Sequence, residues 1–171
     1  NGTANFGNGT SKTITTSGTY TVVATNTSFC SVTSAPIVVT VVADPSITTQ
    51  ATAITECVGG TTALTIVAAG GTPSLTYQWY SNTANANTGG TIIGSATAAS
   101  YTPPSTTAGT TYYYAEVSAS GTACTSVSSN ATAVTIVADP SITTQATAIT
   151  ECIGGSTALT IEAAGGTPSL T

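Results

Sequence analysis

Residues 44–76 read DPSITTQATAITECVGGTTALTIVAAGGTPSLT, and residues 139–171 repeat them with only three changes: Val58 becomes Ile153, Thr61 becomes Ser156 and Val67 becomes Glu162. The two copies are offset by 139 minus 44, or 95 residues. That period is too long for a solenoid unit and fits a small all-β domain. The sequence therefore predicts a tandem array, with the end of one domain in residues 1–43, a complete domain in 44–138 and the start of a third in 139–171.

The chain is almost uncharged. Charged residues make up 4% of it, against roughly 25% in an ordinary soluble domain, and the formal net charge is -5. Lys12 is the only basic residue, and there is no histidine. Binding to nucleic acid or to an anionic membrane requires many Lys and Arg side chains, so neither partner is expected. No run of residues approaches the length of a membrane span, so no membrane insertion is expected in residues 1–171.

The same composition argues against catalysis. A serine or threonine nucleophile needs a base beside it, and the usual triads cannot be built without histidine. Glycoside hydrolysis would need two neighbouring carboxylates, but Asp44 is expected in a linker, Glu56 beside a cysteine and Glu116 in the middle of a strand. We therefore expect no enzyme and no cofactor.

The repeat indicates which face of one strand is buried. A buried carboxylate without a partner costs several kcal/mol, so position 67, which is glutamate in the second copy at position 162, should face water. Side chains alternate between the two faces of a strand. Leu64, Ile66 and Ala68 should then face the core, and so should Leu159 and Ile161 in the third domain.

Thr-rich and Val-rich runs separated by glycine and proline predict short strands and no long helix. We expect a first strand split into 46–50 and 53–57, a second at 62–68, a third at 76–80 and short strands at 91–93 and 98–102. Two long runs follow, at 109–117 and from about 126 to 137. The stretch 81–90 is expected to be a loop.

The aromatic residues divide by the same alternation. Trp79, the only tryptophan, lies in the third strand, where a core position is favoured over a surface role in ligand stacking. In the run Gly109–Val117, an outward Glu116 places Tyr113, Ala115 and Val117 inward. Trp79 and Tyr113 are therefore the predicted core anchors. Tyr80, Tyr112 and Tyr114 should point outward, where aromatic rings could form a platform for sugars.

The cysteines follow the repeat. Cys152 is Cys57 displaced by one period, and Cys30 occupies the place of Cys124 in the preceding unit, so each complete domain has one early and one late cysteine. We expect a disulfide between Cys57 and Cys124, which implies an oxidising, extracytoplasmic compartment. Free thiols in a cytosolic protein are the alternative. Zinc is not favoured, because the sequence has no CxxC motif and no histidine.

Calcium is the remaining metal hypothesis, because it can stiffen the junctions between extracellular domains. Asp44 and Asp139 lie at the two predicted junctions. A calcium site needs six to eight oxygen ligands, and one aspartate per junction makes these residues weak candidates. The Asp-Pro step is also a common way to start a turn.

The residues around Trp79, the tyrosine run and the cysteines resemble those of bacterial immunoglobulin-like domains. The similarity is carried by YQWY around Trp79, by the run GTTYYYAEV and by the two cysteines that flank this region. SGTYTVVATNTSFC, from Ser17 to Cys30, is similar to tandem repeats of large surface adhesins of gliding Bacteroidota. The resemblance implies Greek-key β-sandwiches. Antibody-type domains place both cysteines within facing strands, whereas here Cys57 precedes the second strand and Cys124 follows the long tyrosine strand.

Two functions are consistent with this reading. The first is a structural segment of an extracellular cell-surface fibre or stalk, adhesive in purpose, in which the domains stack end to end or self-associate. The second is a carbohydrate-binding module that uses Tyr80, Tyr112 and Tyr114 to bind surface glycans. The fibre could be one long chain or a polymer of subunits.

Overall fold

The computed structural model describes residues 11–120 and 124–166. Sixteen strands and no helix are found in this part of the chain, so the prediction of an all-β protein is confirmed. No helix of the described residues could cross a membrane. The chain divides between Ala43 and Asp44 into two compact units. The outermost residues of the predicted first and third domains, 1–10 and 167–171, lie outside the described residues.

The region 44–138 is a two-layered β-sandwich. One layer is a six-stranded sheet in the order β10-β9-β12-β14-β6, with β13 beside β12. The other layer consists of the ladders β5–β8 and β7–β11. The sandwich predicted from the sequence is therefore confirmed. The first layer contains β6 (Ile54–Cys57), β9 (Leu75–Asn82), β10 (Thr91–Ile92), β12 (Gly109–Ala119), β13 (Val127–Ser128) and β14 (Thr132–Val137), and the second contains β5 (Ser46–Thr49), β7 (Leu64–Thr65), β8 (Val67–Ala69) and β11 (Ser100–Tyr101).

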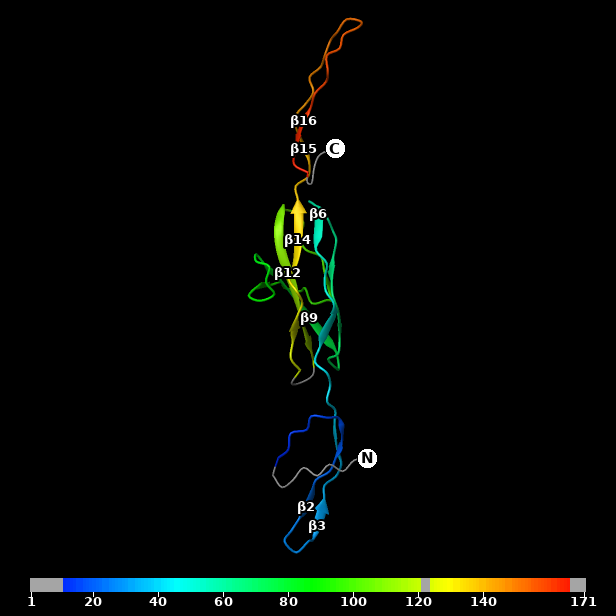
Figure 1. The fold of residues 1–171 in the computed structure, drawn as a ribbon, viewed down its shortest axis with the longest axis vertical. Helices are drawn as coiled ribbons and strands as arrows, with labels where there is room; N and C mark the ends of the chain where they lie inside the picture. Colours follow the sequence, from blue (N-terminus) through cyan, green and yellow to red (C-terminus); the bar gives the residue numbers. More distant parts are fainter. Residues whose placement is uncertain (1–10, 121–123, 167–171) are drawn as a thin grey trace. The chain divides into compact units, whose positions relative to one another are not determined.

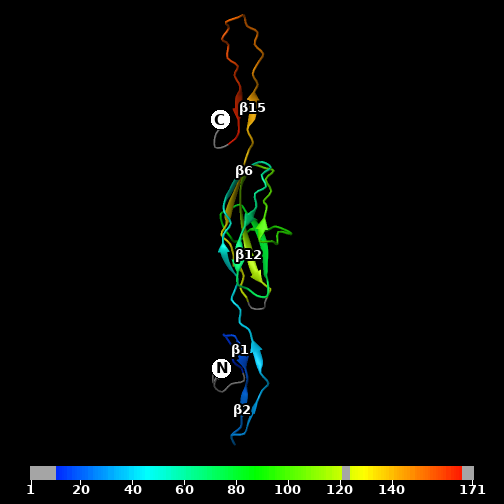
Figure 2. The same cartoon turned by 90° about the vertical axis from the view of Figure 1, so that its right-hand side faces the viewer.

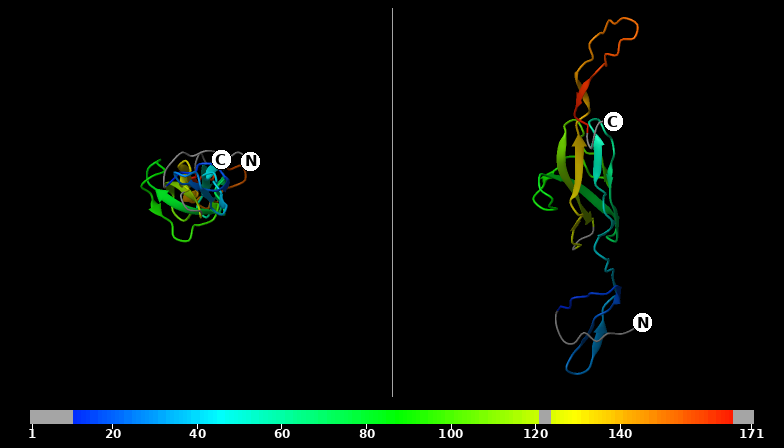
Figure 3. Two further views of the ribbon diagram at one scale, coloured as in Figure 1. Left: turned by 90° about the horizontal axis from the view of Figure 1, so that it is seen from below. Right: turned by 45° about the horizontal axis from the view of Figure 1, so that its top comes forward.

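The first strand is split into two halves, as the sequence predicts, and the structure places the halves in different layers. Its first half, β5, pairs antiparallel with β8. Its second half, β6, crosses to the other layer and pairs in parallel with β14, Cys57 lying opposite Val137. Figure 3, right, shows β6 in cyan beside β14 in yellow. Strand pairing thus joins the beginning of this domain to its end.

The last strand is less regular than predicted. The expected single strand from about 126 to 137 is broken into β13 and β14. Ser129 lies at the break and is 1% exposed. Its hydroxyl accepts a hydrogen bond from the Ala115 N–H at 2.9 Å, and its own N–H donates to the Ala115 carbonyl at 2.8 Å. The serine side chain takes a place that a backbone group would fill in a regular ladder.

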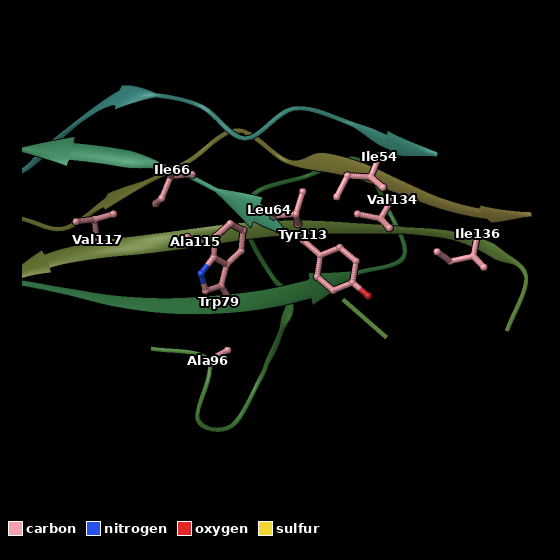
Figure 4. Packing of buried hydrophobic residues seen from close by; sticks show 10 residues of the cluster. All are labelled: Ile54, Leu64, Ile66, Trp79, Ala96, Tyr113, Ala115, Val117, Val134 and Ile136. Carbon is pink, nitrogen blue, oxygen red and sulfur yellow. The ribbon is translucent and has the colours of Figure 1, made fainter. Parts of the chain in front are cut away.

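The core lies between the layers, and Figure 4 shows its side chains pointing toward one another. Trp79 is 0% exposed, and Leu64 and Ile66 are 1% exposed, while Val67 is 49% exposed. The alternation inferred from the change of Val67 to Glu162 is thus confirmed, although Ala68 is only partly buried. The buried cluster consists of Ile54, Leu64, Ile66, Trp79, Ala96, Tyr113, Ala115, Val117, Val134 and Ile136.

The polypeptide enters and leaves this domain at opposite ends. At the entry end Asp44 bonds to Thr125, and Ala119 of β12 lies opposite Leu75. At the exit end Val137 lies opposite Cys57, and Gly109, the first residue of β12, lies opposite Ile136. β12 runs along the domain between the two ends (Figures 1 and 2).

The described parts of the segments on either side of this domain form two-stranded ladders. Residues 18–39 contain the pairs β1–β4 and β2–β3, and residues 141–164 contain the pair β15–β16. Their bounds are β1 (Gly18–Tyr20), β2 (Val23–Thr25), β3 (Ser31–Thr33), β4 (Ile37–Val39), β15 (Ser141–Thr144) and β16 (Glu162–Ala164).

The third segment contains two side chains that were predicted to face the core of a complete third domain. Leu159 and Ile161 were expected to face a core, yet they are 68% and 60% exposed. Their counterparts Leu64 and Ile66 are buried beneath β9 and β12. The described part of 139–171 has no facing sheet, so the same side chains have nothing to pack against.

Candidate functional site

Trp79 and Tyr113, the predicted core anchors, are both placed inside the sandwich. Trp79 lies opposite Ala115 in the β9–β12 ladder, and its ring Nε1–H donates to the Ala98 carbonyl at 2.9 Å. The rings of Trp79 and Tyr101 are 6.0 Å apart, and those of Tyr101 and Tyr113 are 5.7 Å apart. The apolar surface of the indole is therefore covered by packed side chains, and its N–H is hydrogen-bonded. No part of the ring is left for a ligand.

The outer face of the same sheet carries an aromatic pair. Tyr80 and Tyr114 lie opposite each other in the ladder, and their rings stack with centroids 5.0 Å apart and an interplanar angle of 6°. The Tyr80 hydroxyl donates to Glu116 Oε2 at 3.2 Å, and the Ser126 hydroxyl donates to Glu116 Oε1 at 2.6 Å. Desolvation, with a further contribution from the Glu116 carboxylate, raises the pKa of Tyr80 above its usual value.

The predicted tyrosine platform needs correction, because Tyr114 is only 5% exposed. The loop that follows β9 lies over it, and the Gly90 N–H donates to the Tyr114 hydroxyl at 3.2 Å. A Cβ on Gly90 would lie 2.8 Å from the ring, which shows how closely the loop approaches. One face of Tyr114 is covered by Tyr80 and its edge by this loop, while Tyr80 and Tyr112 remain half-buried. No flat three-ring surface of Tyr80, Tyr112 and Tyr114 is presented to solvent.

Asp44 fastens the entry end of the domain. Its Oδ1 accepts the Thr125 N–H at 3.1 Å, and its Oδ2 accepts the Thr125 hydroxyl at 2.7 Å. These two hydrogen bonds, of which the one from the hydroxyl has the larger effect, lower the pKa of the Asp44 carboxyl below its ordinary value of 3.8. Hydrogen bonds to the charged form favour that form. Asp44 thus ties the first residue of the domain to the segment that follows β12.

The structure gives the calcium hypothesis no cluster of ligands. Among the described residues there is no group of three or more acidic, cysteine or histidine side chains that could hold a metal ion. Both carboxylate oxygens of Asp44 are engaged by Thr125, and Asp139 is exposed. The observed role of Asp44 is to hold a backbone segment.

The predicted disulfide within the domain is wrong. Cys57 and Cys124 are both free. Cys57 is the last residue of β6 at the exit end, opposite Val137, whereas Cys124 precedes Thr125, which is bound to Asp44 at the entry end. A disulfide requires Cα atoms within about 7 Å, and the length of the sandwich separates these two residues.

Sequence reasoning missed a second polar clamp, which lies at the exit end. The turn Cys57–Gly60 is closed by a hydrogen bond from the Gly60 N–H to the Cys57 carbonyl at 3.0 Å, with Gly59 at φ 86°. The Glu56 carboxylate folds over this turn and accepts the Thr62 N–H at 3.2 Å. A Cβ on Gly60 would overlap the carboxylate.

The third segment repeats this arrangement. The Glu151 carboxylate accepts the Thr157 N–H at 2.8 Å, and the Gly155 N–H donates to the Cys152 carbonyl at 3.0 Å. The signal in the sequence is the repeated pattern Glu-Cys-x-Gly-Gly, in which Glu and the second Gly are kept in both copies. Each early cysteine is thus held in a defined turn.

The fold and the arrangement of strands define an immunoglobulin-like β-sandwich. Residues 43–140 match the family described as "Ig-like domain CHU_C associated", and this match spans more than half of the chain. The chain belongs to that family. A comparison with curated proteins found no match.

Solved structures that match the chain include tandem immunoglobulin domains. Sidekick-1 immunoglobulin domains 1–4 share 19% identity at a TM-score of 0.46, covering 78% of this chain and 37% of that one. Sidekick-1 immunoglobulin domains 1–5 share 18% identity at a TM-score of 0.47, covering 90% of this chain and 34% of that one. The chain thus spans about a third of the length of each of these structures.

Proposed function

We propose that this chain is a structural repeat segment of an extracellular cell-surface fibre or stalk whose purpose is adhesion. The observation that carries the proposal is the position of the two ends of the domain 44–138. The chain enters beside Thr125 and leaves beside Cys57, at the two ends of β12. A domain of this kind can be joined to identical domains on both sides without folding back on itself.

The connection between repeats supports an extended arrangement. Val137, the last residue of β14, is followed directly by Ala138, Asp139 and Pro140, with no Gly- or Ser-rich spacer. Flexible linkers need glycine and serine, whereas proline fixes φ. Successive domains therefore stack end to end with a nearly constant rotation between neighbours.

The differences between the two copies support the same function. The three positions that differ, Val58, Thr61 and Val67, are all exposed in the complete domain. Every core-facing position of the repeated segment is the same in both copies. A fibre requires units that are interchangeable in shape, and surface variation does not alter the shape of the unit.

An extracellular location fits this composition. The surface is polar through its hydroxyl groups and carries few charges. The partners are other repeats of the same kind, within one chain or in a neighbouring subunit. Tyr114 is covered by a loop, so the three tyrosines do not form one open platform, which favours a structural role over recognition of sugars.

Imaging of the native extracellular material tests the proposal. We expect straight fibres in which density repeats once per domain along the axis. A beaded chain with variable angles at each Ala-Asp-Pro junction would contradict the stacking. Fibres from cells should also carry the adhesive activity, so shearing them off should abolish attachment of the cells to surfaces.

A further inference from the structure

The two cysteines of a complete domain cannot reach each other. β12 runs from Gly109 at the exit end to Ala119 at the entry end. Ten residue steps (119 minus 109) at about 3.3 Å each give a length of roughly 33 Å. Cys57 lies at the exit end and Cys124 beyond the entry end of this strand. Because the sheet is continuous between them, no oxidant can join these two thiols within one folded domain.

The cysteines nevertheless recur with the repeat. Cys152 follows Cys57 by 95 residues (152 minus 57), and Cys124 follows Cys30 by 94 residues (124 minus 30). Cys57 is exposed and Cys124 is half-buried, so neither has become part of the core. Each domain thus carries one accessible thiol at the end where the next repeat begins and another at the end where the previous repeat stops.

Chain length limits the distance between the thiols on the two sides of a junction. Cys57 is paired with Val137 at a spacing of about 5 Å, and Asp139 follows two residues later, at most about 7 Å away. In the domain 44–138 the counterpart of Asp139 is Asp44, whose carboxylate binds Thr125, the neighbour of Cys124.

A complete repeat that begins at Asp139 would hold its own late cysteine in the same way. Adding these steps gives an upper limit on the order of 20 Å between the two cysteines of a junction at full extension of the connecting residues. Any turn in the connection brings them closer. Within a domain, the sheet fixes the distance between the two cysteines. Across a junction, a turn in the connecting residues can bring the two cysteines within bonding distance.

We propose that consecutive domains are covalently linked by an inter-domain disulfide between the early cysteine of one repeat and the late cysteine of the next. Cys57 pairs with the late cysteine of the repeat that begins at Asp139, and Cys124 pairs with the early cysteine of the repeat that ends before Asp44. The proposal rests on the tandem arrangement in the proposed function and is independent of its adhesive role.

The bond forms by thiol–disulfide exchange. Each pair of thiols loses two protons and two electrons, and an S–S bond forms between the two sulfur atoms. A disulfide co-reactant, either a small-molecule disulfide or an oxidised dithiol protein, takes up the electrons and protons and leaves as two thiols. Each junction then has two covalent connections, the Ala-Asp-Pro backbone and the disulfide, which together restrict bending and rotation between neighbours.

The test compares two chains: residues 1–171, and the same chain extended after Thr171 by a second copy of residues 77–138, which completes the third domain. Both are equilibrated at low concentration with reduced and oxidised glutathione, alkylated, and mapped by mass spectrometry without reduction. In the extended chain we expect Cys57 to be linked to the added copy of Cys124. In the 171-residue chain we expect no link between Cys57 and Cys124.

Matched variants come from the repeat itself. Cys57→Ser should abolish the new link, whereas Cys152→Ser, the same change at the exit end of the third domain, should leave it intact. A link between Cys57 and Cys124, or a Cys57 thiol that stays open to alkylation although the added tryptophan is buried, would overturn the proposal. An added tryptophan that remains solvent-exposed, judged by its fluorescence, would overturn the tandem arrangement and with it the proposed function.

Discussion

At the scale of single residues, the stability of the domain depends most on Trp79. It is fully buried and hydrogen-bonded. Trp79→Ala should lower the free energy of unfolding by roughly 3–5 kcal/mol through the cavity it leaves. Urea unfolding followed by far-UV circular dichroism measures the change. Tyr112→Ala, on the half-buried outer face of the same sheet, is the control, and an equal loss in both variants would contradict the assigned role of Trp79.

Asp44 gives a second residue-scale prediction, which concerns pH. Its pKa is lowered in the folded state, so the ionised carboxylate stabilises the fold. This contribution is complete above the unfolded value near 3.8 and is lost as the pH falls through the lower, folded value. Thr125→Val removes the hydroxyl donor but keeps the N–H, so the Asp44 pKa should rise part of the way towards its ordinary value.

Carbon-detected NMR titration of the Asp44 carboxyl group measures this shift. Thr110→Val, the same substitution at the exit end of the domain, should leave the Asp44 titration unchanged. An Asp44 that already titrates at its ordinary pKa in the unsubstituted protein would refute the hydrogen-bonded clamp.

Predictions for single residues succeeded where the alternation of side chains between the two faces of a strand decides whether a residue is buried or exposed. The change of Val67 to Glu162 identified the solvent face of a strand, because a lone carboxylate cannot be buried cheaply. Tyr114 was predicted to be exposed because alternation places it on the outer face of the sheet. It is on that face, opposite Tyr80, but the approach of Gly90 covers it. Coverage by a distant loop leaves no periodic signal in the sequence.

At the scale of elements, the segment 64–69, which contains β7 and β8, provides a matched comparison. Val67→Glu copies the natural difference between the two repeats at an exposed site, so it should change the free energy of unfolding by no more than about 0.5 kcal/mol. Ile66→Ala, at the adjacent buried site, should cost about 2–5 kcal/mol. Thermal and urea unfolding measure both changes. If Val67→Glu lowered the free energy of unfolding as much as Ile66→Ala, position 67 would face the core, and the assignment of the two faces would be wrong.

The turn between β8 and β9 depends on a glycine. Gly70 has φ 78°, and a Cβ there would lie 2.6 Å from the backbone oxygen of Asp44. The left-handed conformation alone costs an alanine about 1–2 kcal/mol, and the backbone oxygen cannot move aside without disturbing the start of the domain. Gly70→Ala should therefore lower the free energy of unfolding by more than this amount.

Gly94 is the control for that substitution, because a Cβ there meets nothing within 4 Å. Gly94→Ala should be neutral or slightly stabilising, since alanine restricts the unfolded chain. Chemical unfolding of both variants gives the comparison. Equal stability of the two would mean that the turn readily relaxes.

At the scale of the whole molecule, the 95-residue period predicts repeated domains, but spacing alone could not place the cysteines. Which end of a sandwich a residue occupies depends on how many times the chain crosses the domain before reaching it. From Cys57 the chain returns through β7 and β8 and advances through β9. It then turns back through the short β10, advances again through the short β11 and returns through β12 before reaching Cys124. A pair 67 residues apart (124 minus 57) is therefore adjacent or distant according to the number of crossings, and only the register of the strands decides between the two.

The third segment supplies the whole-molecule prediction. Ile149, Leu159 and Ile161 are 37%, 68% and 60% exposed, whereas their counterparts Ile54, Leu64 and Ile66 are 8%, 1% and 1% exposed. The sequence around them differs only at Ile153, Ser156 and Glu162, whose counterparts are exposed, so the difference in burial comes from the facing sheet that covers the complete domain. Two strands alone are marginally stable in water. Extending the chain after Thr171 by a second copy of residues 77–138 should supply that sheet and bury these side chains.

Hydrogen–deuterium exchange of the two chains measures the effect. In the 171-residue chain, amides of 159–164 should exchange rapidly, because local opening costs little where few apolar contacts are made. In the extended chain the same amides should become as protected as those of 64–69. An extended chain that also carries Trp→Ala in the added copy is the control, since it supplies the strands without their core anchor and should restore rapid exchange. Fast exchange at 159–164 in the extended chain without that substitution would mean that the 95-residue period does not correspond to a folding unit.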